Sequence, residues 1–413
     1  MSALTWIALV SLAAWGWLLL GQGLFWRTDI RLPRRHDPAR EDWPTVALIV
    51  PARDEAEVLP VSLPSLLEQD YPGRAVVFLI DDGSTDGTAK IARELAADCE
   101  QGLPLVVASP GEPAPGWTGK LWAVRHGIAL ARAQLEPEFL LLTDADIAHE
   151  PDSLRELVRA ARSRDLDLVS QMARLRVATG WERLIVPAFV YFFAQLYPFR
   201  WVNRPGARTA AAAGGCVLLR TEAAERARVP ESIRQSVIDD VALARAVKRA
   251  GPPRPAPGPG ASVAAPAGRA TGGRVWLGLA ERVDSVRPYP HLGELWRMVS
   301  RSAYAQLRHN PALLAATVVG LAVVYLVPPV AVGVGALRGA RVMWLAGALA
   351  WAVMAGTFLP MLRYYRLSPW WAPLLPFTAA LYLLMTVDSA IQHYRGRGAA
   401  WKGRTYARPK AAP

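Results

Sequence analysis

The stretch Phe139-Leu140-Leu141-Leu142-Thr143-Asp144-Ala145-Asp146 decides how the fold of this chain is interpreted. A short run that is apolar on both faces is typical of a buried strand in a parallel sheet. This run stops at two carboxylates, and ligands of open α/β sheets bind at the carboxyl ends of strands. Two carboxylates one residue apart suit a divalent cation that also contacts substrate phosphates. Taken alone, the pair is at least as typical of a turn whose Asp residues cap the next helix.

Strand and helix patterns alternate on both sides of this stretch. Apolar strands are expected at 45–50, 76–80, 105–108 and 274–279, with helices between them. Alternating units of this length predict an α/β fold with a doubly wound, mostly parallel sheet.

The bulk composition indicates a protein that is part soluble and part membrane-embedded. The 413 residues are 52% hydrophobic, which is too apolar for a wholly soluble enzyme, and the net charge is +12. Such a charge fits a membrane surface or an anionic substrate. Because neither a helix-turn-helix pattern nor an aromatic-basic RNA motif is present, no nucleic-acid partner is expected. Cys99 and Cys216 are the only cysteines, which excludes a disulfide framework.

Four apolar stretches are long enough to cross a bilayer. The first, Leu4–Phe25, is predicted to be a retained anchor rather than a cleaved signal peptide, because it lacks a basic start. The arginines after it place the next segment in the cytoplasm by the positive-inside rule. Three full crossings at 312–336, 341–362 and 369–391 would then put the basic tail outside, against the same rule. Either one of the three stretches does not cross, or the tail is an exception to the rule. If one does not cross, Pro328-Pro329 favours the first of the three as broken or re-entrant.

The chain is therefore expected to divide into six parts. They are a transmembrane anchor at 1–26, a nucleotide-binding α/β domain at 43–251, a flexible Pro/Gly/Ala insertion at 252–273, the end of that domain with an amphipathic interface segment at 274–310, transmembrane helices at 311–392, and a basic tail at 393–413.

Four further motifs follow strand or helix boundaries, and each has two interpretations. Asp82, in Asp81-Asp82-Gly83-Ser84, either starts a helix or binds a base or ribose. Lys120 is either surface charge or a point charge on phosphate. Gly214-Gly215 allows either tight packing or close approach to a ligand. Asp239-Asp240 either complements a helix N-terminus or supplies a general base beside the cleft.

The aromatic stretch Leu184–Phe199 is short for a membrane span. It is predicted to be a core helix, with an interfacial segment near a lipid acceptor as the alternative.

In this order, the motifs resemble those of family 2 glycosyltransferases, which have a nucleotide-sugar-binding α/β domain of the GT-A type. Within that superfamily the chain, apart from the 252–273 insertion, resembles the membrane-bound hopanoid-biosynthesis-associated glycosyltransferases. The matching pieces are Pro51-Ala52-Arg53-Asp54-Glu55, Asp81-Asp82-Gly83-Ser84, Gly116–Trp122, Thr143–His149, Ala212–Cys216, Asp239-Asp240 with Leu243, Arg287-Pro288-Tyr289-Pro290 and Trp401-Lys402-Gly403-Arg404.

The resemblance implies a role for each matching residue. Pro51, Arg53, Glu55 and Asp82 would surround the base and ribose, and Lys120 would lie near the nucleotide. Asp144 and Asp146 would face the diphosphate, with Asp146 the more direct ligand of Mg²⁺ or Mn²⁺. Gly214 and Gly215 would line the nucleotide-sugar site. Asp240 would deprotonate the acceptor hydroxyl for an inverting attack, with Asp239 beside the diphosphate or acceptor.

One departure narrows the activity that the resemblance implies. Processive polysaccharide synthases of the superfamily carry Gln-x-x-Arg-Trp, and the corresponding stretch here is Met298-Val299-Ser300-Arg301-Ser302. Only Arg301 matches, as a possible diphosphate or acceptor contact. The expected activity is transfer of one sugar to a hopanoid or other isoprenoid lipid at the bacterial cytoplasmic membrane, with the catalytic domain facing the cytoplasm. The alternatives are a metal-dependent nucleotidyltransferase and a non-catalytic membrane binding or transport subunit.

Overall fold

The computed structural model describes residues 2–32, 42–251, 272–396, 400–401 and 404–405. These residues divide into two compact units. The α/β unit contains Ile30–Leu175 and Trp201–Arg287, and the helical unit contains Met1–Asp29, Arg176–Arg200 and Pro288–Tyr406. Most of the expected insertion at 252–273 and of the basic tail lies outside the described residues, so those two predictions stay predictions.

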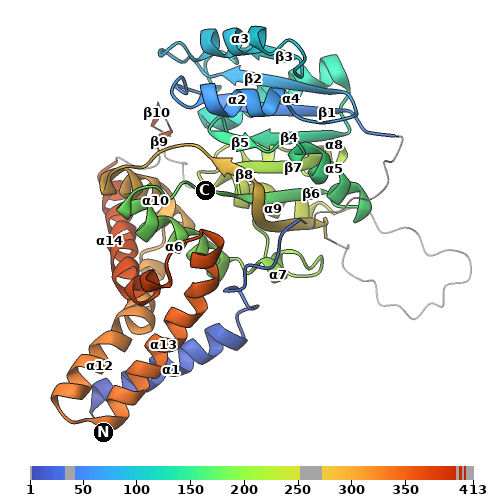
Figure 1. Ribbon diagram of the computed structural model, residues 1–413. Helices are drawn as coiled ribbons and strands as arrows, with labels where there is room; N and C mark the ends of the chain where they lie inside the picture. The colour runs from blue at the N-terminus through green and yellow to red at the C-terminus, as the bar shows by residue number, and fades with distance from the viewer. Residues whose placement is uncertain (1, 33–41, 252–271, 397–399, 402–403, 406–413) are drawn as a thin grey trace, which may run out of the picture. The chain divides into compact units, whose positions relative to one another are not determined.

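Within the described residues, one eight-stranded sheet forms the centre of the α/β unit, with strand order β3-β2-β1-β4-β7-β6-β8-β5 (Figure 1). The predicted α/β class with a doubly wound, mostly parallel sheet is confirmed, and β7 and β5 are the strands that run antiparallel to their neighbours. The strands are β1 Val46–Ala52, β2 Ala75–Asp81, β3 Leu105–Ala108, β4 Phe139–Thr143, β5 Ile147–His149, β6 Leu168–Arg174, β7 Cys216–Arg220 and β8 Val275–Ser285.

The direction of β7 is the feature of the sheet that matters most for the site. Strands β3, β2, β1 and β4 are parallel neighbours, but β7 runs antiparallel to β4. Cys216, the first residue of β7, therefore pairs with Thr143, the last residue of β4. The segment that enters β7, Gly214-Gly215, is thus brought to the strand end that Asp144 follows.

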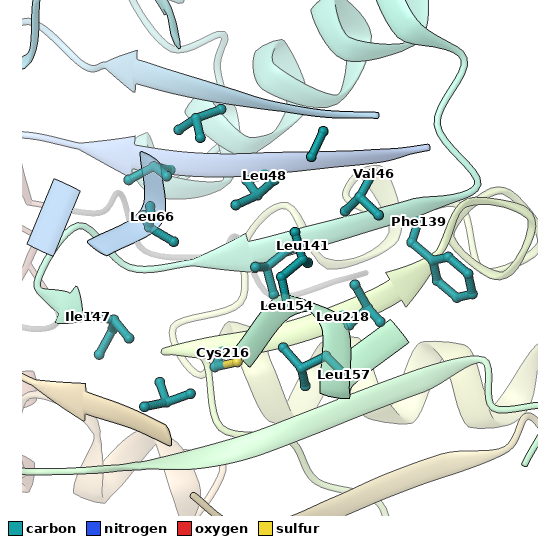
Figure 2. Packing of buried hydrophobic residues seen from close by; sticks show 14 of the residues in the cluster. Val46, Leu48, Leu66, Phe139, Leu141, Ile147, Leu154, Leu157, Cys216 and Leu218 are labelled. Carbon is teal, nitrogen blue, oxygen red and sulfur yellow. The ribbon is translucent and has the colours of Figure 1, made fainter. Parts of the chain in front are cut away.

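Alternate residues of the central strands face two different helix layers. On one face, Leu48, Leu141 and Leu218 pack with Leu66 of α2 and Leu154 of α5 (Figure 2). This alternation follows from the two-residue period of a strand. The helices of the unit are α2 Leu59–Leu67, α3 Thr88–Asp98, α4 Gly119–Leu135, α5 Ser153–Ser163, α8 Thr221–Arg226 and α9 Asp239–Arg249, with a 3₁₀ turn at Glu231–Ile233.

Helix α4 covers the opposite face and approaches it closely at Gly127. A Cβ atom at Gly127 would lie 2.6 Å from Cγ2 of Ile49, so only glycine lets α4 sit this near β1. Helices on both faces bury the strands and leave the strand ends as the place for polar side chains.

The helical unit contains four helices that are long and apolar enough to cross a membrane, counted over the described residues. They are Ala3–Leu20, Pro311–Leu337, Arg341–Tyr364 and Pro369–Tyr394, matching the four stretches expected from the sequence. Its elements are α1 Ala3–Leu20, α6 Gly180–Leu196, α10 Leu292–Gln306, α11 Pro311–Leu321, a π-helical turn at Ala322–Leu326, α12 Val327–Leu337, α13 Arg341–Tyr364, a 3₁₀ turn at Pro369–Leu374 and α14 Leu375–Tyr394. The short helix α7, Phe199–Val202, and the two-residue strands β9, Ala400–Trp401, and β10, Arg404–Thr405, complete the described elements.

The expected break at Pro328-Pro329 is replaced by the π-helical turn that precedes it, and the helix continues on both sides. Prolines have no N–H, so the carbonyl of Val324 finds no donor four or five residues ahead. The indole Nε1–H of Trp15 on α1 donates to that carbonyl at 2.7 Å instead. A side chain from another helix thus satisfies the backbone group that the prolines leave without a donor.

Replacing Trp15 with phenylalanine should destabilise the helical unit measurably. Phenylalanine keeps a ring against Tyr325, which Trp15 contacts edge-on, but it leaves the Val324 carbonyl without its donor. An unsatisfied buried acceptor costs about 1–3 kcal/mol. Thermal unfolding in detergent should show a lower midpoint for Trp15→Phe than for the wild type. The matched control is Trp17→Phe on the same helix, where the side chain is 61% exposed; equal midpoints for both variants would contradict this account.

The aromatic stretch of α6 forms part of the core of the helical unit. Tyr191 is fully buried, and its hydroxyl lies 2.8 Å from that of Thr357 on α13. The hydroxyl of Tyr382 on α14 donates to the carbonyl of Ile185 at 3.0 Å. The prediction of a core helix at Leu184–Phe199 is confirmed for this part of the chain.

Candidate active site

Strand ends and helix starts of the α/β unit bring most of the predicted site residues to one edge of the sheet. Asp144 and Asp146 follow β4, the segment around Glu55 follows β1, and Asp82 follows β2. Parallel strands end at the same edge, and helix N-termini there favour anions. Lys120 lies in the first turn of α4, and Asp239-Asp240 form the first turn of α9.

Lys120 joins the end of β4 to the start of α9. Its Nζ lies 2.8 Å from Oδ1 of Asp144 and 3.1 Å from Oδ2 of Asp239. Burial alone would lower the pKa of Lys120, but the two carboxylates outweigh it and raise the pKa above its usual value. The side chain is therefore a permanent positive charge at the strand end, and the interpretation of Lys120 as surface charge is wrong, since it is only 21% exposed.

Asp240 is held by backbone donors from two segments. Its Oδ2 accepts from the N–H of Gly214 at 3.1 Å, and its Oδ1 accepts from the N–H of Val241 at 2.7 Å. Burial, followed by the charge of Asp239, raises the pKa of Asp240 to about 7, although the two N–H donors and Lys120 act in the opposite direction. A carboxylate that titrates near neutrality is suited to general base catalysis.

Asp240 is buried because it lies beside a cavity with a mainly apolar wall. A cavity of about 30 Å³ lies among Lys120, Asp144, Asp239 and Asp240, and its remaining wall is mainly apolar. That wall is formed by Pro51, Leu121, Val124, Leu142, Thr143, Gly214, Val217, Val229, Pro230, Ile233 and Leu243. Such a wall excludes water from the carboxylate and so disfavours its charged form.

The two glycines before β7 have different surroundings. A Cβ atom at Gly214 would lie 3.5 Å from Cβ of Asp240 and 3.6 Å from Nζ of Lys120, so a longer side chain would fill the polar site. A Cβ atom at Gly215 would lie 3.1 Å from Cδ1 of Ile147, in the core. Of the two interpretations of this pair, close approach to a ligand suits Gly214 and tight packing suits Gly215.

Buried hydroxyl groups fix the strand end on which these residues depend. The hydroxyl of Thr143 donates to the carbonyl of Gly215 at 2.8 Å, so its oxygen accepts from Nε2 of His149 at 3.0 Å. Nδ1 of His149 then accepts from the hydroxyl of Ser153 at 3.2 Å. Burial lowers the pKa of His149 to about 4, so the ring is neutral. These residues were not predicted to have a role, and they position the backbone beside Asp144 and Gly214.

The carboxylate of Asp146 contacts residues at the end of β8, whereas that of Asp144 contacts Lys120. The hydroxyl of Ser285 donates to its Oδ2 at 2.8 Å, and Nε of Arg287 lies 3.3 Å from the same oxygen. Nη2 of Arg287 lies 2.5 Å from Oε2 of Glu55, whose carboxylate is almost fully buried. Arg287 was noted in the sequence only as part of a motif, and the geometry identifies it as a site residue.

The remaining predicted residues lie in or after β1 and β2 of the α/β unit, or in the helical unit. Arg53 donates through Nη1 to the carbonyl of Asp82, and the same nitrogen lies 3.4 Å from Oδ2 of Asp82. Pro51 is buried within β1. Arg301 lies on α10 in the helical unit, where its side chain is exposed, so its contact with a diphosphate stays a prediction.

The carboxylates after β4 fit a divalent cation that takes few protein ligands. Among the described residues, no group of three or more His, Cys, Asp and Glu side chains is arranged to hold a metal ion. Mg²⁺ in enzymes is commonly bound by one or two carboxylates together with substrate phosphates and water. Asp144 and Asp146 provide carboxylate oxygens of that kind, 35% and 15% exposed respectively.

Comparison with known proteins was made for sequence and for structure. A family profile described as "Glycosyltransferase like family 2" matches residues 44–253. An N-acetylglucosaminyltransferase from Rhizobium leguminosarum bv. viciae is 29% identical over 153 residues, covering 37% of this chain and 33% of that protein. A beta-monoglucosyldiacylglycerol synthase from Synechocystis sp. is 33% identical over 123 residues, covering 30% of this chain and 24% of that protein. The matches thus span about a quarter to a third of the length of these curated relatives.

One solved structure resembles the chain over nearly its whole length. It is a mannosyltransferase from Pyrobaculum calidifontis in complex with GDP-Man and Mn²⁺, with a TM-score of 0.54 at 19% identity. The match covers 94% of this chain and 99% of that chain. This likeness shows the fold.

Proposed function

Because the chain belongs to glycosyltransferase-like family 2, we propose that it is a membrane-bound enzyme that moves a single sugar from a nucleotide-sugar donor to a lipid acceptor. The observation that carries this proposal is that Lys120, Asp144 and Asp240 lie together beside Gly214. Lys120 contacts Asp144, and Asp240 accepts a hydrogen bond from the N–H of Gly214. A base with a pKa near 7 and a fixed positive charge near acidic cation ligands are what sugar transfer from a diphosphate requires.

In the proposed reaction, the carboxylate of Asp240 takes the proton of an acceptor hydroxyl as its oxygen attacks the anomeric carbon. The bond from that carbon to the diphosphate breaks on the opposite side, so the configuration inverts. Lys120 stabilises the negative charge that develops on the leaving diphosphate. A divalent cation bound by Asp146 and Asp144 would neutralise further charge there.

The nucleoside of the donor is proposed to lie against the first two strand ends. Asp82 is 1% exposed and is tied to Arg53, so it presents a fixed carboxylate beside β2. Glu55 is proposed to act there as well, although its Oε2 meets Arg287. Fixed carboxylates of this kind accept hydrogen bonds from ribose hydroxyls and base N–H groups.

A lipid acceptor is supported by the four helices long enough to cross a membrane. The similarity to a diacylglycerol-modifying enzyme agrees with an acceptor of that class. A hopanoid or another isoprenoid is proposed as the acceptor on the basis of the resemblance to hopanoid-biosynthesis-associated glycosyltransferases. The proposed location is the bacterial cytoplasmic membrane. The arginines that follow the first span support an orientation with the α/β unit facing the cytoplasm.

The donor can be identified with membranes from cells that overproduce the protein. The membranes are incubated with a panel of radiolabelled nucleotide sugars, and the lipids are extracted and separated. The proposal expects label in a lipid from at least one donor, above the level in membranes without the protein. Absence of labelled lipid with every donor would contradict the lipid acceptor.

The pH dependence of transfer should identify Asp240 as the base. Because the base must be deprotonated, kcat/KM should rise with pH around a midpoint near 7. Asp239→Asn removes a charge that raises the pKa of Asp240, so the midpoint should fall. Lys120→Met removes a charge that lowers this pKa, so the midpoint should rise, whatever happens to the maximal rate. Measured pH–rate profiles whose midpoints move in the same direction in both variants would contradict the assignment.

A further inference from the structure

We propose that Arg287 binds the diphosphate of the donor. When a divalent cation binds the Asp146 carboxylate, the guanidinium of Arg287 leaves that carboxylate and contacts the donor phosphates. The inference rests on the proposed function, because it assigns the ligand as a nucleoside diphosphate. It identifies a second positively charged contact for the diphosphate: Lys120 lies beside Asp144, and Arg287 lies beside Asp146.

The position of Arg287 follows from the pairing of two short strands. β5 runs antiparallel to β8, with Ile147 opposite Ser285, and the N–H of Val286 donates to the carbonyl of Asp146 at 2.9 Å. The end of β8 therefore passes directly over Asp146. Arg287 lies at the end of this segment, and no change of the fold is needed for its side chain to reach the strand end.

The charges around Arg287 indicate that its guanidinium supplies the positive charge that a divalent cation would otherwise supply beside Asp146. Its guanidinium lies between the carboxylates of Glu55 and Asp146, which are 7% and 15% exposed. Two buried carboxylates that both stay ionised side by side need a compensating positive charge. When a divalent cation takes the Asp146 carboxylate, the guanidinium and the cation repel each other at this distance.

The chemistry of the guanidinium decides where it goes. It has five N–H donors, so it can keep the contact of Nη2 with Glu55 while its other donors bind a second group. Its planar fork matches phosphate oxygens, and it stays charged at every working pH. Glu55 thus acts as a pivot that keeps Arg287 beside the diphosphate, and the cation and the diphosphate bind cooperatively.

The test uses the full chain purified in detergent and two binding measurements. Binding of Mn²⁺ alone is followed by loss of the free-Mn²⁺ signal in electron paramagnetic resonance. Binding of UDP and of GDP, with and without Mn²⁺, is followed by calorimetry. In Arg287→Gln, Mn²⁺ alone should bind several-fold more tightly than in the wild type, because a competing charge is gone. The better nucleotide should bind roughly 10- to 100-fold more weakly in the presence of Mn²⁺, the usual effect of losing a charge-assisted hydrogen bond.

Two further variants separate this role from a structural one. Arg174→Gln breaks another ion pair beside the end of β8, between Arg174 of β6 and Asp284 of β8 at 2.8 Å, and should leave both affinities unchanged. Arg287→Lys keeps the charge without the fork, so Mn²⁺ should bind as weakly as in the wild type while only part of the nucleotide affinity returns. Thermal unfolding checks that each variant is folded.

The outcomes distinguish this inference from the proposed function. A wild type that binds Mn²⁺ and a nucleotide, with Arg287→Gln unchanged in either affinity, would overturn the inference alone. Weaker Mn²⁺ binding in Arg287→Gln would also overturn it, because it would show that the guanidinium supports the cation site. A wild type that binds neither UDP nor GDP would overturn the proposed function and the inference together.

Discussion

Replacing Asp240 with asparagine should reduce sugar transfer by roughly 10²- to 10⁴-fold, the usual contribution of a general base. The amide oxygen of asparagine can still accept from the N–H of Gly214, so the start of α9 should keep its position. Since the base acts only in the chemical step, the affinity for the nucleotide sugar should change little. The rate is measured as sugar transferred to lipid, and the affinity by calorimetry with the intact donor.

The control for Asp240→Asn is Asp98→Asn, an exposed acid at the end of α3 that should behave as the wild type. An Asp240→Asn enzyme with normal transfer would remove Asp240 from the reaction. An equally large loss of donor affinity would show instead that Asp240 binds the donor rather than acting as the base.

Replacing Asp146 with alanine should remove the dependence of nucleotide binding on a divalent cation. A cation at a leaving diphosphate contributes several kcal/mol, so transfer should fall by roughly a hundredfold or more. The hydroxyl of Ser285 also loses its acceptor, so a lower unfolding midpoint is expected. The affinity for UDP and GDP is titrated with and without Mn²⁺, and the two values should converge in Asp146→Ala.

The matched control for Asp146→Ala is Asp284→Ala, which removes a carboxylate of β8 that pairs with Arg174 of β6. Mn²⁺ should still strengthen nucleotide binding in this control. If Mn²⁺ strengthens nucleotide binding in Asp146→Ala as much as in the wild type, the cation is held elsewhere.

The sequence predicts the half of the site that depends on strand ends and helix starts. Apolar runs mark β1, β2 and β4, and each run stops at a polar residue. Because parallel strands end at one edge, the polar residues after β1, β2 and β4 are expected to lie near one another. Local patterns left Lys120 and Asp239 with two interpretations each, and only the family resemblance implied that they share a site with Asp144.

The contacts of β8 could not be predicted in the same way. Arg287 is 141 positions after Asp146 in the chain, counted as 287 minus 146. The pairing of β5 with β8 that joins them depends on three residue pairs and leaves no periodic signal in the sequence. Arg301, which was noted from its place in a motif as a possible diphosphate or acceptor contact, lies on α10 of the helical unit, and that contact stays a prediction.

Compensation between distant backbone and side-chain groups was also beyond local patterns. Pro328-Pro329 predicted a broken span because two prolines remove two donors. The indole of Trp15, more than 300 positions away, supplies the missing hydrogen bond at Val324. The two prolines do remove backbone hydrogen-bond donors, as the sequence predicts. Tertiary contacts decide whether the helix tolerates that loss.

The central claim is that the site around Asp240 transfers a sugar from a nucleotide sugar to a lipid. The most direct test is one reaction of purified protein, labelled donor and bacterial lipid extract, in which nucleoside diphosphate and lipid-bound sugar are measured together. We predict equal amounts of the two products with the wild type and neither product with Asp240→Asn. Nucleoside diphosphate released without lipid-bound sugar, or both products formed at the wild-type rate by Asp240→Asn, would contradict the claim.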